Sequence, residues 1–287
     1  MTLFMQSLLN GVLMGFVYAL IALGLSIVFG VMNLSNFAHG EFVMLAMYST
    51  FWVSVLGGVD AVATAVITFP LLFLFGALTY YVVLDRTLQG PFVTRLAVTV
   101  GLMTLFRAVA QLLWTPQARA LPYSVIQGNL DIGGGLVIIQ SRLISAAISM
   151  VAIFGVYLFL EKTWPGRAMR AASDDVEAAS LMGVNYRRVY ALAFGLGSAV
   201  TAIAGALLMT FQQVSPIVGL RFGLVSWAVM CLAGLGSIPS LLISGVLVGV
   251  TESVAMAFWD PKARSIVVYT IFILVLALKP RGLFGKK

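Results

Sequence analysis

Long apolar runs follow one another along most of this sequence, and each is long enough to cross a bilayer as a helix, which takes about 20 residues. Only 9% of the 287 residues are charged and 61% are hydrophobic, whereas a soluble domain carries roughly 25% charged residues. The sequence therefore predicts an all-α, polytopic transmembrane helical bundle that forms a single domain over residues 1–287. We distinguish nine runs, and the seventh is short enough to be a half-span, which gives about 8–9 spans: residues 3–32, 38–56, 61–84, 92–114, 141–160, 189–212, 222–235, 238–259 and 264–279.

Lysine and arginine residues collect at the ends of these runs, where they set the topology of membrane proteins. With nine crossings and an outer N-terminus, eleven of the seventeen basic residues lie on the cytoplasmic side and five on the outer side, while Arg107 falls inside a run. The opposite orientation would reverse this ratio, so we expect the N-terminus outside and the C-terminus in the cytoplasm. No basic patch with interleaved aromatic residues lies outside the runs, which argues against a nucleic acid as partner.

The sequence contains few residues that could form a catalytic, metal or nucleotide-binding site. One histidine and few carboxylates leave general acid–base catalysis without groups to use, and one histidine beside one carboxylate is too few ligands for a metal site. Cys231 is the only cysteine, so no disulfide can form within the chain. No Gly-x-x-x-x-Gly-Lys-[Ser/Thr] loop occurs that could bind a nucleotide phosphate. We therefore expect no catalytic residues, no metal and no cofactor, and an energy source for any transport must come from an ion gradient or a separate ATPase.

The longest polar interruption, residues 161–188, lies on the predicted cytoplasmic side between two spans. At its centre Asp174 can cap a short helix while Glu177 reaches back to complete a capping box, and Gly183 supplies the left-handed residue that ends a helix. A helix over residues 174–182 is too short to be stable alone in water. We interpret it as a docking element for another protein, with a solvated loop as the alternative.

A second polar interruption, GVMNLSNFAHGE at residues 30–41, separates the first two runs. Irregular polar backbone near membrane depth is tolerated where it is buried in protein or lines a cavity, and ionisable residues at a span entrance are functional candidates. The alternative is a short cytoplasmic turn in which Ser35 or Asn36 caps the next helix. If the stretch lines a substrate pathway, the residues concerned are Asn33, Asn36, Phe37, His39 and Glu41.

Two further connecting stretches leave alternatives open. Residues 115–140 form the longest outer stretch, and two apolar clusters around Gly-rich turns predict a short hairpin on the outer surface, which either receives a soluble partner or seals the outer mouth. Residues 233–240, AGLGSIPS, either border a translocation pathway or form a tight turn.

Inside the apolar runs, two pairs of glycines four residues apart predict close helix packing, Gly11 with Gly15 and Gly245 with Gly249. Arg107 and Glu252 also lie well inside runs, where a charge is costly unless it is paired or faces water. They can pair with each other or with a second subunit.

Several stretches resemble a known family. Glu177-Ala178-Ala179-x-x-x-Gly183 resembles the EAA loop of ABC importer permeases, a cytoplasmic helix that sits in a cleft of the ATPase subunit, although the Leu-Pro that often follows it is missing. Residues 18–41, 166–185, 233–239 and 279–285 resemble, in the same order, branched-chain amino acid permeases of the LivH type. The similarity runs from about residue 10 to 285.

This resemblance implies a permease subunit of an ATP-driven importer in a bacterial inner membrane. It implies a homologous, LivM-like second permease, two ABC ATPase subunits that bind the ATP and Mg, and a periplasmic solute-binding protein. The substrate would be a branched-chain amino acid or a related small solute such as another amino acid, urea or a short amide. The residues coupled to the ATPase would be Asp174, Glu177, Ala178, Ala179 and Gly183. An ion-gradient-driven secondary transporter and a passive channel are the competing readings.

Overall fold

The computed structural model describes residues 1–88, 90–122, 126, 128–234, 237–258, 263–279 and 282–284. Several basic residues of the orientation argument, Lys262, Arg281, Lys286 and Lys287, lie outside these ranges, as do two residues of the 233–240 stretch. The helices are α1 (Thr2–Met32), α2 (His39–Gly57), α3 (Ala65–Thr79), the π-helix η1 (Tyr80–Leu84), α4 (Asp85–Thr87), α5 (Phe92–Trp114), α6 (Gln140–Lys162), α7 (Trp164–Asp174), α8 (Val176–Leu181), α9 (Tyr186–Leu208), α10 (Val218–Ala233), α11 (Ile238–Phe258) and α12 (Ala263–Leu278). The strands are β1 (Asn129–Gly133) and β2 (Leu136–Ile139).

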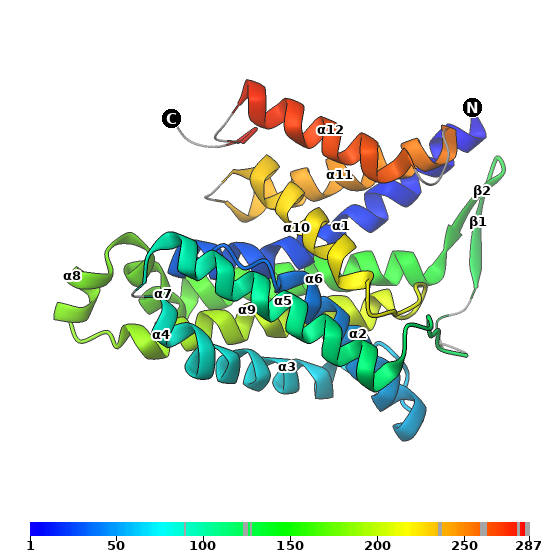
Figure 1. The fold of residues 1–287 in the computed structure, drawn as a ribbon. Helices are drawn as coiled ribbons and strands as arrows, with labels where there is room; N and C mark the ends of the chain where they lie inside the picture. Colours follow the sequence, from blue (N-terminus) through cyan, green and yellow to red (C-terminus); the bar gives the residue numbers. More distant parts are fainter. Residues whose placement is uncertain are drawn as a thin grey trace.

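The helices form a polytopic bundle, which confirms the predicted fold class. Among the described residues, seven helical segments are long and apolar enough to cross a membrane. The shorter apolar helices α10 and α12 occupy the seventh and ninth predicted runs. The start of α1 and the β1–β2 hairpin lie at one end of the bundle, and α7, α8 and the end of α12 lie at the other (Figure 1). This grouping agrees with the orientation inferred from basic residues, although which end faces the cytoplasm stays a prediction.

The centre of the bundle is α1, which packs most extensively against α11. Their two glycine pairs face each other: a Cβ added at Gly15 would lie 2.5 Å from the Cα of Val246, and one at Gly249 would lie 2.4 Å from the carbonyl oxygen of Gly11. Backbones this close leave no room for a side chain, as expected for small residues at helix interfaces in lipid. The prediction that both glycine pairs serve helix packing is confirmed.

Two helices begin deep inside the bundle rather than at its ends. Nε2 of His39, the first residue of α2, lies 2.9 Å from the carbonyl oxygen of Ile21, which is eleven residues, or about 16 Å at 1.5 Å per residue, from the end of α1. The start of α10 lies at the same level, because a Cβ at Gly40 would overlap the carbonyl oxygen of Gly219. Residues 33–38, named segment 33–38 below, therefore run back into the bundle as irregular chain.

The predicted hairpin in the stretch 115–140 is confirmed. Strands β1 and β2 pair antiparallel, and glycines with positive φ form the turn between them. Gln6 of α1 holds the hairpin by donating to the carbonyl oxygen of Val137 at 2.6 Å and accepting from its N–H at 2.9 Å. The hairpin is thus fixed to the first turns of the central helix.

Candidate functional site

Segment 33–38 and the start of α2 separate the five predicted pathway residues into two groups. Asn36 and His39 are buried, and the Asn36 side chain accepts from the N–H of Ala38 at 3.1 Å. The backbone carbonyl oxygen of Asn36 also accepts from the N–H of His39, so Asn36 shapes the turn before α2. The alternative prediction that Ser35 or Asn36 caps α2 is wrong, because the N-cap residue is Ala38 and it makes no side-chain cap hydrogen bond. Asn33 and Phe37 are exposed, and Phe37 stacks on Trp227 of α10 with ring centroids 5.3 Å apart. Only these two can meet a solute at the surface of the described chain.

Glu41, the fifth predicted residue, forms a buried ion pair with Arg107 of α5. Its Oε1 accepts from Nη2 of Arg107 at 2.5 Å and from Nε at 3.2 Å, and the glutamate side chain is 1% exposed. Its Oε2 has no hydrogen-bond partner among the described residues and lies against Gly219. The carboxylate thus sits at the first turns of both α2 and α10, where the positive ends of two helix dipoles favour a negative charge.

A second buried cluster joins α1, α10 and α11. Arg221 donates to the Tyr18 hydroxyl at 3.0 Å and to Oε1 of Glu252 at 3.2 Å, and Tyr18 itself donates to Oε2 of Glu252. Arg107 and Glu252 therefore do not pair with each other, because Arg107 pairs with Glu41 and Glu252 pairs with Arg221. Arg221 is one of the five basic residues assigned from the sequence to the outer side, and Tyr18 is not among the predicted site residues. The available signal was a basic residue immediately before the short apolar run 222–235.

The polar stretch 161–188 folds into two helices rather than one. Asp174 ends α7, and the cap of α8 is Asp175, whose Oδ1 accepts from the N–H groups of Glu177 at 2.9 Å and Ala178 at 3.0 Å. The prediction that Asp174 caps the helix is therefore wrong by one residue, because the acid whose backbone is extended is the one that can cap. The helix predicted over residues 174–182 is only six residues long in the structure, Val176–Leu181. Gly183, with φ +86°, ends it as predicted.

The predicted coupling residues lie on a projecting corner of the molecule. Ala179 is buried against the rest of the chain, whereas Glu177 and Ala178 are exposed. Leu181 and Met182, at the end of α8, are 89% and 86% exposed. Figure 1 shows α8 as the outermost element at its end of the bundle. The corner therefore presents apolar side chains to whatever lies beyond that end.

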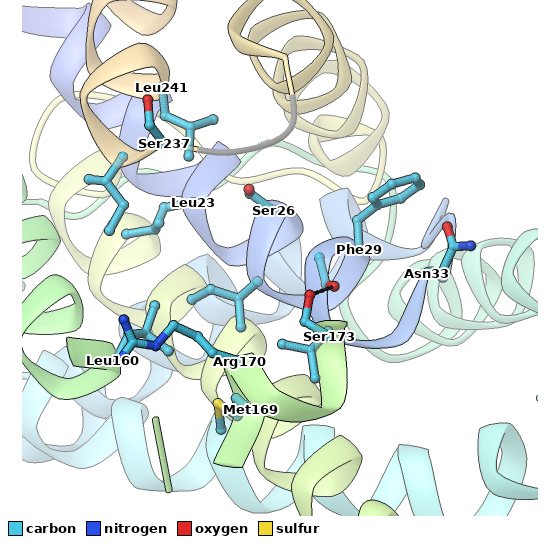
Figure 2. A pocket seen from close by; sticks show the side chains of 14 residues that line it. Leu23, Ser26, Phe29, Asn33, Leu160, Met169, Arg170, Ser173, Ser237 and Leu241 are labelled. Carbon is cyan, nitrogen blue, oxygen red and sulfur yellow. Dashed lines mark hydrogen bonds between the residues drawn. The ribbon is translucent and has the colours of Figure 1, made fainter. Parts of the chain in front are cut away.

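A cavity of about 540 Å³ lies where α7 meets α1 (Figure 2). It brings together residues from three stretches that the sequence analysis treated separately: Asn33, then Arg170 and Ser173 of α7, then Ser237 beside α11. At its edge Ser173 donates to the carbonyl oxygen of Gly30 at 2.6 Å, which ties α7 to the last turn of α1. The cavity is thus bordered both by the irregular chain after α1 and by the unit that carries α8.

The segment formed by η1 and α4 is joined to α9 beside α8. Asp85 accepts from the Tyr80 hydroxyl at 3.0 Å and lies 3.4 Å from Nε of Arg187. Tyr80 and Asp85 border a second cavity, of about 580 Å³, together with residues of α8. Within the described part of the chain, no group of three His, Cys, Asp or Glu side chains could hold a metal ion.

Comparison with known proteins places these features in context. The family described as "Branched-chain amino acid transport system / permease component" matches residues 7–276. The chain is 30% identical to the high-affinity branched-chain amino acid transport system permease protein LivH of Escherichia coli K12, and 28% identical to BraD of Pseudomonas aeruginosa, which carries the same description. Each alignment covers 99% of this chain and 96% of the relative. The solved structure of PsaBC from Streptococcus pneumoniae in complex with Fab shares the fold, with a TM-score of 0.51 at 13% identity over 96% of this chain and 92% of that one.

Proposed function

The chain belongs to the family of branched-chain amino acid transport permeases, and from that premise we propose that it is the permease subunit of an ATP-driven importer in a bacterial inner membrane. It would form the pathway together with a homologous second permease, while two separate ATPase subunits bind ATP and Mg and a periplasmic solute-binding protein delivers the substrate. The names of its relatives favour a branched-chain amino acid as substrate. This chain itself would carry out no catalysis and hold no cofactor.

The observation that carries this proposal is the exposed, doubly anchored corner formed by α7 and α8. A six-residue helix is not stable alone in water, yet α8 has its own side-chain cap at Asp175 and a left-handed stop at Gly183. It ends in two apolar side chains, Leu181 and Met182, that the chain leaves uncovered. An exposed apolar helix end, held between a side-chain cap and a left-handed stop, fits docking into a cleft of another protein better than it fits a solvated loop.

A contact between α7 and α1 connects this corner to the membrane helices, so movement of α8 can be transmitted to them. The Ser173–Gly30 hydrogen bond joins α7 to the end of α1, and segment 33–38 begins immediately after α1. Displacement of α8 by the ATPases would therefore be passed to the chain that carries Asn33 and Phe37. We assign these two residues to the wall of the pathway. The buried residues Asn36, His39 and Glu41 would support this wall through their contacts inside the bundle.

Co-purification tests the docking role directly. Leu181→Asp should lose the ATPase subunits from a mild detergent extract while the chain still accumulates in the membrane. Leu130→Asp is the matched control, since Leu130 is an exposed leucine on β1 at the opposite end of the bundle. Equal recovery of the ATPases with both variants would refute the role of α8.

The two rival functions predict a different result. A secondary transporter driven by an ion gradient, or a passive channel, would transport without any ATPase subunit in the extract. Uptake that survives complete removal of the ATPases would favour either rival, and its response to collapse of the ion gradient would separate the two.

A further inference from the structure

The cavity of about 540 Å³ between α7, α1 and α11 has an apolar floor and a polar rim (Figure 2). Its volume lies within the range of small-molecule sites, about 300–1,000 Å³. The floor consists of four buried lining residues without aromatic rings: Leu23, Ile27, Met169 and Leu241. The rim consists of four exposed polar lining residues: Asn33, Arg170, Ser173 and Ser237. A ligand that suits this cavity combines an aliphatic group with a polar head.

The walls of the cavity come from four helices of this chain. α1 supplies Leu23, α6 supplies Leu160, α7 supplies Arg170 and α11 supplies Leu241. The proposed pathway lies instead between this chain and a second permease, so the cavity offers a separate place for a ligand. α7 and the last turns of α1 put the cavity at the end of the bundle that carries α8 (Figure 1), which the basic residues predict to be cytoplasmic.

Two charges of opposite sign lie side by side at the rim. Nη1 of Arg170 donates to Oε1 of Glu161 at 2.6 Å, and the two side chains are 47% and 39% exposed. A guanidinium has five N–H donors and a carboxylate has about four acceptor positions, so this one pair leaves donors for an anion and acceptors for a cation. A lone carboxylate would be attracted by Arg170 but repelled by Glu161, and a lone ammonium the reverse. The pair therefore favours a ligand that carries both charges.

We propose that the cavity binds a free aliphatic α-amino acid, and that its occupancy holds α7 in place against α1 and α11. The ligand carboxylate accepts from Arg170 and the ligand ammonium donates to Glu161. The aliphatic side chain lies on the floor, against Leu23, Ile27 and Leu241. This rests on the proposed function, because the branched-chain amino acid that the importer would deliver to the cytoplasm has this chemistry. The cavity is thus a site for imported substrate on the unit that carries α8.

Occupancy of the cavity acts on α8 through α7. The helix α7 contacts α1, α6, α8 and α9, so displacement of α8 moves α7 relative to the other walls. A ligand that touches α7, α1 and α11 at once favours the arrangement in which the three surround it, and shifts the population toward that arrangement by its difference in affinity. Movement of α7 away from α1 opens the cavity and loses those contacts. Bound amino acid therefore slows the ATP-driven cycle.

The first experiment measures binding of leucine to the purified importer without its solute-binding protein, by equilibrium dialysis. We expect saturable binding of leucine. We expect at least tenfold weaker binding of 4-methylpentanoate, which lacks the ammonium, and of 3-methylbutylamine, which lacks the carboxylate. Absence of saturable leucine binding, or equal affinity for leucine and either analogue, would overturn the proposal.

The second experiment places the bound leucine. Arg170→Gln removes the guanidinium from the rim, and Arg167→Gln makes the same change three residues earlier on α7, away from the lining. We expect the affinity for leucine to fall at least tenfold in Arg170→Gln and to stay unchanged in Arg167→Gln. Ser26→Trp fills the cavity from α1 and should abolish binding, which decides the matter if Arg170→Gln fails to assemble. Leucine binding that survives in both Arg170→Gln and Ser26→Trp, or a phospholipid found in the cavity in place of leucine, would refute the assignment.

The third experiment tests the restraint on α7. ATP hydrolysis by the complete importer in nanodiscs is followed while leucine is raised beyond the concentration that saturates the solute-binding protein. We expect the wild type and Arg167→Gln to lose at least half of their hydrolysis rate, and Arg170→Gln to be insensitive to the excess leucine. Equal inhibition of all three would overturn the restraint.

The same preparations separate this proposal from the proposed function. Absence of ATPase subunits from the extract, together with leucine binding that Arg170→Gln weakens, would refute the importer reading and leave the site standing. Normal recovery of the ATPases without leucine binding would do the reverse.

Discussion

The buried ion pair between Glu41 and Arg107 allows a prediction with a magnitude. In Arg107→Met the carboxylate of Glu41 loses both of its hydrogen bonds from the guanidinium, while its Oε2 already has no partner among the described residues. Removing one member of a buried pair costs about 3–5 kcal/mol, because an uncompensated charge is left behind. For a chain of this size each kcal/mol corresponds to about 2–4 °C in unfolding temperature. We therefore expect the midpoint of the purified chain in detergent to fall by about 6–20 °C.

The chain contains its own control for this measurement. Arg170 and Glu161 form an ion pair of similar length, 2.6 Å, but with side chains 47% and 39% exposed. Exposed pairs contribute about 0–1 kcal/mol, so Arg170→Met should lower the midpoint by less than about 4 °C. The double variant Glu41→Gln with Arg107→Met removes the stranded charge and should recover at least half of the loss. Equal shifts for the two single variants, or no recovery in the double variant, would refute the assignment of a buried, charged Glu41.

Three further predictions follow from the local geometry. Asp175→Ala should weaken α8 by about 1 kcal/mol, the value of a typical N-cap, and lower ATP-coupled uptake, whereas Asp174→Ala should leave uptake close to normal. Gly249→Leu should prevent accumulation of the folded chain, measured by fluorescence-detected gel filtration, because its Cβ would overlap α1, while Gly155→Leu should accumulate normally. His39→Ala removes the contact with Ile21 and should lower the amount of assembled complex; a normal amount of complex with reduced uptake would instead place His39 in the pathway.

Features set by neighbouring residues could be predicted from the sequence. The apolar runs gave the spans because hydropathy over about 20 residues reports membrane crossing directly. The two glycine pairs predicted close packing because residues four apart share a helix face, and Gly183 predicted the end of α8 because its left-handed backbone favours glycine. Each of these features depends on residues that are close together in the sequence, so it can be inferred without knowing which segments pack together in the fold.

Features set by long-range pairing could not be predicted. Hydropathy gave residues 30–41 as a polar gap between spans but could not show that the chain folds back so that His39 meets Ile21. Arg107 has its partner 66 residues earlier, and no local pattern distinguishes Glu41 from Glu252 as that partner. Asp174 and Asp175 are adjacent acids, and the capping role went to the second because α7 continues through the first. Each miss concerns a choice between residues that only the tertiary contacts distinguish.

The two buried charge clusters have a common place in the architecture. Each holds one of the two helices that begin at mid-depth: Glu41 is in the first turn of α2 and pairs with α5, and Arg221 is the fourth residue of α10 and pairs with α11 and α1. The two are not equivalent, because a helix N-terminus favours a carboxylate and disfavours a cation. Glu41 is thus stabilised by α2 itself, and one arginine suffices as its partner. Arg221 works against the dipole of α10, which explains why it is surrounded by Glu252, the Tyr18 hydroxyl and Gln212. The cluster around Arg221 therefore fixes the start of α10 to the central helix, and the ion pair at Glu41 fixes the start of α2 to α5.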